Sequence, residues 1–162
     1  MNRLVYSNIA IKALNSAKMH KNQLLSLDRD LSSIQTDILI LQVKGADSSV
    51  IMFKQNEKQN IQNRRTKMIY SIANEVNTAI INATNALKIS VQQGNSTMVI
   101  LDDYMLQNIA NFVNEYYKSN ELQLAIKNIC NTTMIKYEIA TLIINYKQRF
   151  LPGLINLNNV LS

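Results

Sequence analysis

The sequence predicts an all-α fold, an elongated antiparallel helical bundle of three long arms. Glycine and proline together account for only four of the 162 residues, so residues that break helices are rare. They stand at Gly45, Gly94, Pro152 and Gly153. These breaks divide the chain into arms of about 3–44, 47–93 and 97–150. Within each arm the apolar residues recur three and four positions apart, which is the spacing of a helix face.

The first arm contains a regular heptad seam, which is the candidate packing or oligomer seam of the chain. Its members step by three and four residues: Leu24, Leu27, Leu31, Ile34, Ile38 and Leu41. A seam of this kind buries its side chains against another helix. We therefore expect Leu27, Leu31, Ile34 and Ile38 to be buried.

The second arm is apolar far from Gly45 and polar close to it. Residues 69–87 keep the heptad spacing, whereas residues 54–67 hold a single aliphatic residue, Ile61. A hairpin that turns at Gly45 sets residues 24–41 level with about 49–66. We expect that stretch to be too polar to cover the seam of the first arm.

Two arrangements of the third arm are open. The apolar register before Ser119 and Asn120 does not join the register after them, so the helix is kinked or broken there. If it runs as one long arm, residues 124–144 cover the seam of the first arm, and this three-arm bundle is our prediction. If the chain instead reverses near 119–120, the protein is a four-helix bundle. The Gly45 end of the hairpin then protrudes uncovered and needs another chain.

The formal net charge is +6, and the first two thirds of the chain carry all of the excess. A basic stretch at 54–67 is the candidate nucleic-acid or polyanion contact, and its cations are Lys54, Lys58, Arg64, Arg65 and Lys67. Lysine and arginine on one helix face are able to bind phosphates. No aromatic residue within 54–67 offers a stacking surface for bases. A solvated helix face is the simpler interpretation.

Catalysis has little support in the sequence. His20 is the only histidine and Cys130 the only cysteine, so no histidine pair or histidine–cysteine metal set exists. Asp102 and Asp103 are adjacent on a predicted helix and point about 100° apart, so they do not converge on one ion. We expect them to cap the start of a helix. The expectation is a protein that is not an enzyme, with no catalytic residue, no cofactor and no metal.

The chain is expected to form a single helical-bundle domain over 1–162, and its tail at 151–162 carries apolar residues able to dock on the bundle or on a neighbour. No apolar run approaches 18 residues, and no signal-peptide pattern is seen, so we expect an intracellular protein or one within a particle. The predicted function is a non-enzymatic structural or protein–protein interaction protein. It would be a self-associating helical subunit of a larger assembly, viral or secretion-related. The alternative is a nucleic-acid-associated protein that uses residues 54–67.

Overall fold

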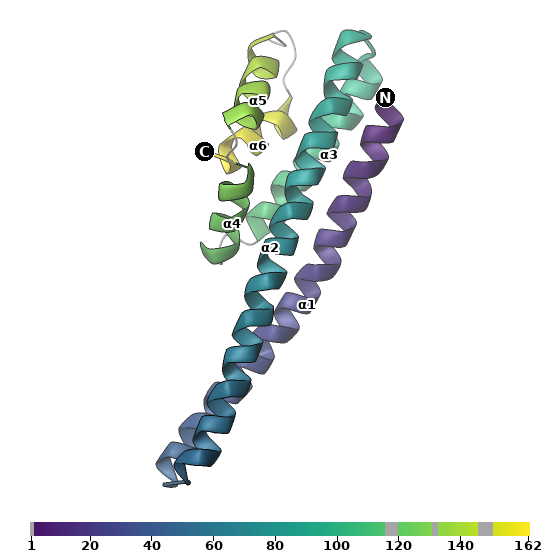
Figure 1. Cartoon of the computed structure of the whole chain (residues 1–162). Helices are drawn as coiled ribbons and strands as arrows, with labels where there is room; N and C mark the ends of the chain where they lie inside the picture. The colour runs from purple at the N-terminus through teal and green to yellow at the C-terminus, as the bar shows by residue number, and fades with distance from the viewer. Residues whose placement is uncertain (1, 116–119, 131–132, 146–150) are drawn as a thin grey trace.

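The computed structural model describes residues 2–115, 120–130, 133–145 and 151–162 (Figure 1). Within these ranges the chain forms six helices and no strand. The helices are α1 (Arg3–Val43), α2 (Ser48–Gln92), α3 (Ser96–Glu115), α4 (Asn120–Cys130), α5 (Thr133–Asn145) and α6 (Pro152–Val160). The prediction of an all-α fold of long helices packed against each other is confirmed.

The first two helices form a long hairpin that turns at Gly45. Gly45 has φ 67°, a backbone conformation that side chains with a Cβ rarely adopt. The Ala46 amide donates to the Leu41 carbonyl at 3.0 Å and the Gly45 amide to the Gln42 carbonyl at 3.2 Å, which is the Schellman arrangement. Gly94 has φ 65° and closes α2 in the same way. At 1.5 Å per residue, the 45 residues of α2 are about 67 Å long.

The predicted third arm, about 97–150, does not run along the hairpin as one long helix. After α3 ends at Glu115, α4 and α5 turn back and follow α2 in its own direction. Glu121 of α4 pairs with Arg65, and Glu138 of α5 pairs with Lys88 at 2.9 Å. The chain therefore follows the reversed alternative, and the prediction that residues 124–144 cover the seam of α1 is wrong. The predicted break at 119–120 falls between α3 and α4, and residues 116–119 lie outside the described part.

The reversal has a physical reason. The second half of α2 is its apolar half, and it offers a larger apolar surface to α4 than the polar stretch 54–67 does. Leu122 and Ile126 of α4 are fully buried there. The polar stretch also covers the seam of α1 better than expected, since Ile34 and Ile38 are only 6% and 8% exposed.

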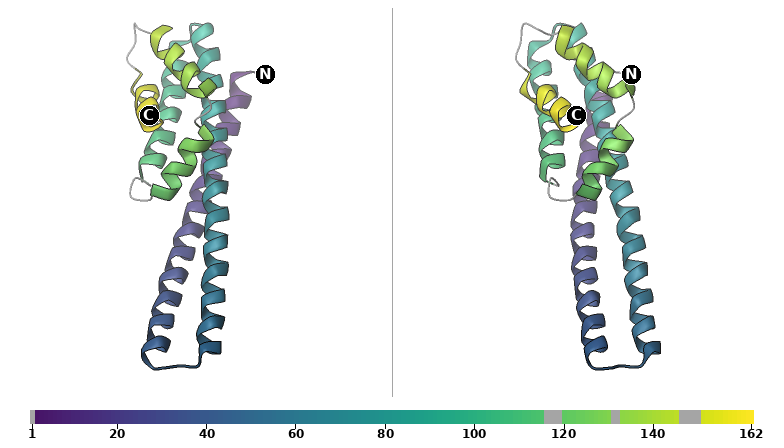
Figure 2. Two further views of the ribbon diagram at one scale, coloured as in Figure 1. Left: turned by 60° about the vertical axis from the view of Figure 1, so that its left-hand side comes forward. Right: turned by 90° about the vertical axis from the view of Figure 1, so that its left-hand side faces the viewer.

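The molecule consists of a packed base and a protruding arm (Figure 2). The base holds α3–α6 and the adjoining halves of α1 and α2. Its continuous core reaches Leu24 on α1 and Ile69 on α2, and none of the residues 25–67 belongs to it. The arm, residues 27–67, is the two-helix end of the hairpin that carries the Gly45 turn. Figure 1 shows no other helix beside the lower part of the arm.

The prediction that both aspartates cap the start of a helix is confirmed for Asp103 and wrong for Asp102. Asp102 is 2% exposed and accepts hydrogen bonds from Arg3 and from the Ser90 hydroxyl, so it links α3 to α1 and α2. Asp103 does cap a helix, but the helix is α6. It accepts from the Gly153 and Leu154 amides at 2.9 and 2.8 Å. The start of α3 is capped instead by Asn95, whose side chain accepts from the Met98 amide at 3.2 Å.

The apolar tail at 151–162 docks on the base, mainly against α3. Its buried side chains are Leu151, Leu154, Leu157, Val160 and Leu161. Gly153 lies so close to α3 that a Cβ there would stand 2.0 Å from the Asp103 carbonyl oxygen. Only glycine fits this crossing, which fixes where α6 packs.

Candidate interaction site

An exposed apolar cluster surrounds the end of the arm. We call it the tip cluster, and its members are Leu39, Ile40, Val43, Val50, Met52 and Phe53. Their exposed fractions lie between 46% and 87%, and Val43 is the most exposed. Large apolar side chains gathered at one exposed end of a molecule are typical of an interaction site, whereas single exposed ones are common everywhere.

The tip cluster lies off the seam that holds the two helices together. Successive residues of a helix turn by about 100°, so Val43 lies on the face of α1 opposite Ile34, and Leu39 lies at the side of the seam, next to Ile38. Phe53 likewise points away from α1 and is 63% exposed. The apolar groups thus cover the outer surfaces of both helices.

Sequence reasoning missed this cluster, although a signal for it was present. The heptad seam accounts for Ile38 and Leu41, but it leaves Leu39, Ile40 and Val43 without a partner. The run from Val50 to Phe53 is also apolar just beyond the turn. Apolar residues outside the seam on both sides of one glycine indicate a surface that the hairpin itself does not bury.

Charge is balanced around the tip cluster. Residues 37–58 carry three cations and three anions, so this segment is neutral although the chain has a net charge of +6. Lys44 and Asp47 stand in the turn itself, one on each side of Gly45. The basic excess of the protein therefore lies elsewhere.

The predicted seam is an intramolecular contact between α1 and α2. Leu24, Leu27, Ile34 and Ile38 are buried, while Leu31 and Leu41 are half-buried. Near the tip, Ile38 and Leu39 line a groove of about 410 Å³ with Gln55 and Lys58 of α2. The aliphatic stem of a lysine is able to cover apolar surface while its charge stays in water. This explains how a polar stretch covers an apolar seam.

The five cations of the basic stretch have different surroundings. Lys54 lies 3.5 Å from Glu57, and Arg65 pairs with both Asp28 and Glu121 where the arm meets the base. Burial lowers the pKa of Arg65, but its hydrogen bonds to the two carboxylates outweigh this effect and raise the pKa above its ordinary value. Lys58 is half-buried, and Arg64 and Lys67 are exposed. Arg64 and Lys67 share a groove with Asp30, so an anion is close to them as well.

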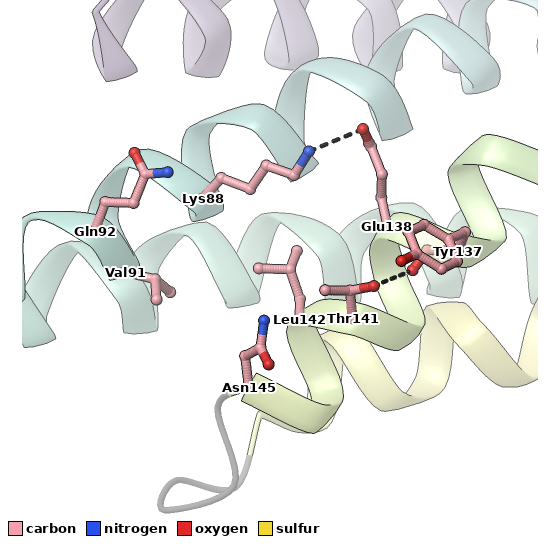
Figure 3. Close-up of a pocket in the computed structure, with 8 residues that line it drawn as sticks. All are labelled: Lys88, Val91, Gln92, Tyr137, Glu138, Thr141, Leu142 and Asn145. Carbon is pink, nitrogen blue, oxygen red and sulfur yellow. Dashed lines mark hydrogen bonds and ion pairs between the residues drawn. The ribbon is translucent and has the colours of Figure 1, made fainter.

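A second groove of about 530 Å³ lies between α2 and α5 (Figure 3). Val91 and Leu142 form apolar parts of its wall, and Lys88 and Glu138 pair across it. The Thr141 hydroxyl donates to the Tyr137 carbonyl, so its hydrogen atom is already used. The groove offers apolar surface but no pair of groups arranged for proton transfer or nucleophilic attack.

The only histidine and the only cysteine of the chain were both expected to have structural roles. His20 of α1 lies against α2, where its Nδ1 is 2.6 Å from Glu75 Oε1. Cys130 is the last residue of α4, and its side chain lies outside the described part of the chain. Among the described residues no three of His, Cys, Asp and Glu gather as metal ligands do, and no helix is long and apolar enough to cross a membrane.

Comparison of the chain with protein-family models, with curated proteins and with solved structures gives no match.

Proposed function

We propose that the chain is a non-enzymatic interaction protein that contacts other proteins through the end of its arm. The single observation that carries the proposal is the tip cluster. Six large apolar side chains are exposed between residues 39 and 53 at the far end of a two-helix arm, whereas the large apolar side chains that the base exposes are distributed over α1 to α5. Removing such side chains from water in a contact between proteins is favourable.

The shape of the molecule supports the same role. The base holds its helices together by a continuous core and by buried polar links such as Arg3 with Asp102. The arm extends away from it as a hairpin anchored at its foot by Arg65 with Asp28 and Glu121. A stable base with a projecting hairpin presents an apolar end at a fixed distance from the rest of the protein.

A protein partner fits the tip better than a lipid bilayer does. The most distal part of the arm is the turn with Lys44, Gly45 and Asp47. Insertion of the tip cluster into a bilayer would carry these two charges in first, at a cost in free energy of about 2.5–3.5 kcal/mol for each charge at the bilayer centre. A protein surface is able to cover the apolar side chains and leave the turn in water.

The nucleic-acid alternative has less support from the arrangement of the cations. Two of the five cations of the basic stretch, Lys54 and Arg65, already have carboxylate partners. Binding to phosphates would require these pairs to open or would depend on Lys58, Arg64 and Lys67 alone. Its signature would be nucleic acid that copurifies and is removed by salt.

The proposal is tested by comparing what copurifies with three tagged forms of the full chain in the cells that produce it. The first is the wild type and the second is the tip variant, Val43→Asp with Phe53→Asp. The third is a matched control on the base, Ile100→Asp with Leu101→Asp, whose original side chains are exposed to a similar degree. Quantitative mass spectrometry should find proteins, untagged copies of the chain included, that are lost only from the tip variant. Equal recovery with all three forms would overturn the proposal.

A further inference from the structure

We infer that the tip cluster binds a second copy of this chain, so that two arms pack end against end in a symmetric dimer with the two bases at opposite ends. This inference rests on the proposed function and names its partner. It uses three properties of the end of the arm: the neutrality of residues 37–58, the apolar side chains on both helices, and the pair of opposite charges in the turn.

Electrostatics favour the tip as the place where two copies meet. Two chains with a net charge of +6 each repel one another when their basic regions approach. The segment 37–58 is neutral, so its contact with an identical segment adds no repulsion. An end-to-end arrangement also places the two basic remainders as far apart as the molecule allows. At separations well above the Debye length of about 8 Å their repulsion is screened.

The apolar side chains suit a contact between identical surfaces. Three of them, Leu39, Ile40 and Val43, come from α1, and the other three, Val50, Met52 and Phe53, come from α2. In a twofold contact each residue meets its counterpart in a reciprocal way. Where the two ends meet, apolar side chains from both helices of one copy contact those of the other.

The turn contributes complementary charges to the same contact. Lys44 and Asp47 stand on either side of Gly45 at the end of each arm. In a twofold arrangement Lys44 of one copy pairs with Asp47 of the other, and the reverse pair forms as well. Exposed pairs of this kind add little affinity, but they favour one registration of the two arms.

The test uses the purified full chain in size exclusion coupled to light scattering over a range of protein concentrations. The wild type should rise from 18.4 kDa towards twice that mass as its concentration increases. Val43→Asp with Phe53→Asp should weaken the dimer at least about tenfold, because it places charges in the apolar centre of the contact. The control Ile100→Asp with Leu101→Asp should dimerise like the wild type. Raising the salt concentration should leave the dimer intact, since salt screens the repulsion between the bases.

A lysine-reactive cross-linker identifies the contact within the dimer. A Lys44–Lys44 link joins two copies of one residue, so it arises only between chains, and it should be found in wild type and control. A chain that stays at 18.4 kDa at every concentration overturns the inference, as does a dimer that the tip variant retains in full. If the chain is monomeric but a different protein is lost from the tip variant in cells, the inference fails while the proposed function stands. Should nothing depend on the tip in either experiment, both fail.

Discussion

Arg3 and Asp102 hold the beginning of the chain against the start of α3. The Arg3 guanidinium donates from Nε to Asp102 Oδ2 at 2.9 Å and from Nη2 to Oδ1 at 2.5 Å. Asp102 is 2% exposed, and its Oδ2 also accepts from the Ser90 hydroxyl at 2.5 Å. One carboxylate thus joins α1, α2 and α3 at the end of the base that lies opposite the arm.

Arg3→Ala should destabilise the base strongly, because it leaves a buried carboxylate without its cation. Breaking a buried ion pair by removing one partner costs about 3 kcal/mol or more. Unfolding in urea, followed by circular dichroism, measures the loss. The control is Glu57→Ala, which removes an exposed pair on the arm and should cost less than about 1 kcal/mol. Equal stability of the two variants would show that the Arg3 pair contributes nothing beyond a surface contact.

Gly153→Ala should displace α6 from α3. The added Cβ would stand 2.0 Å from the Asp103 carbonyl oxygen, so the helix has to move and the amide donors to Asp103 move with it. We expect a loss of about 3 kcal/mol in the free energy of unfolding. Limited proteolysis should cut the variant within 151–162 much faster than the wild type.

Gly94→Ala is the matched control for this substitution. Its Cβ meets nothing within 4 Å, and only its φ of 65° opposes the change, which costs about 1–2 kcal/mol. The tail should therefore stay protected from protease in this variant. Rapid cleavage within the tail of both variants would contradict the role assigned to Gly153.

The stability contribution of Asp103 should decrease as pH rises. Burial raises the pKa of Asp103 above its ordinary value of 3.8, and the Gly153 and Leu154 amides lower it by less. The folded state therefore holds this proton more tightly than the unfolded state does, so the contribution is full below pH 3.8 and is lost as pH rises through the raised pKa. Asp103→Asn does not titrate, so it lacks this dependence.

The measurement is the free energy of unfolding of wild type minus that of Asp103→Asn, taken from about pH 3 to pH 7. Other carboxylates titrate in both proteins and cancel in this difference. The difference should fall with rising pH above the ordinary pKa of the carboxyl. A difference that rises with pH would mean that the two amides outweigh burial.

Ile34→Ala should loosen the arm more than the base. Ile34 is 6% exposed but lies outside the continuous core, so its loss costs about 2 kcal/mol, the lower end for such a truncation. Amide hydrogen exchange within 30–62 should become about thirtyfold faster, while exchange in the base changes little. Leu39→Ala is the control because its side chain is exposed, and it should leave exchange of the monomer unchanged. Equal acceleration throughout the chain would show that the arm and the base unfold together.

Much of the fold could be predicted from spacing alone. Gly45 and Gly94 end helices because each adopts a left-handed conformation in a Schellman turn, and a chain with so few breakers has few other places to turn. The seam from Leu24 to Ile38 follows from the heptad. The direction of α4 could not be predicted from spacing, because it depends on which half of α2 offers the larger apolar surface to α4. Leu122 and Ile126 gain more burial against the apolar half of α2 than against residues 54–67.

The site was harder to predict than the fold. The sequence draws attention to the basic stretch, yet Lys54 and Arg65 acquire carboxylate partners, and the partners of Arg65 come from distant parts of the chain. Asp103 was expected to cap the start of a helix, but the sequence could not show that this helix is α6, whose Gly153 amide lies 50 residues away along the chain. The tip cluster is exposed because α4 turns back along the other half of α2 and leaves the end of the arm without a cover.

The most direct test of the central claim is a photoreactive amino acid placed at position 43 of the full chain in the cells that produce it. Val43 is 87% exposed at the end of the arm, so a reactive group there reaches whatever protein covers the tip. The same group at position 104 on the base is the control, since Tyr104 is also well exposed. We expect a strong protein adduct from position 43, at twice the mass of the chain, and little from position 104. Irradiation that yields no protein adduct from position 43, or the same adducts from both positions, would contradict this expectation.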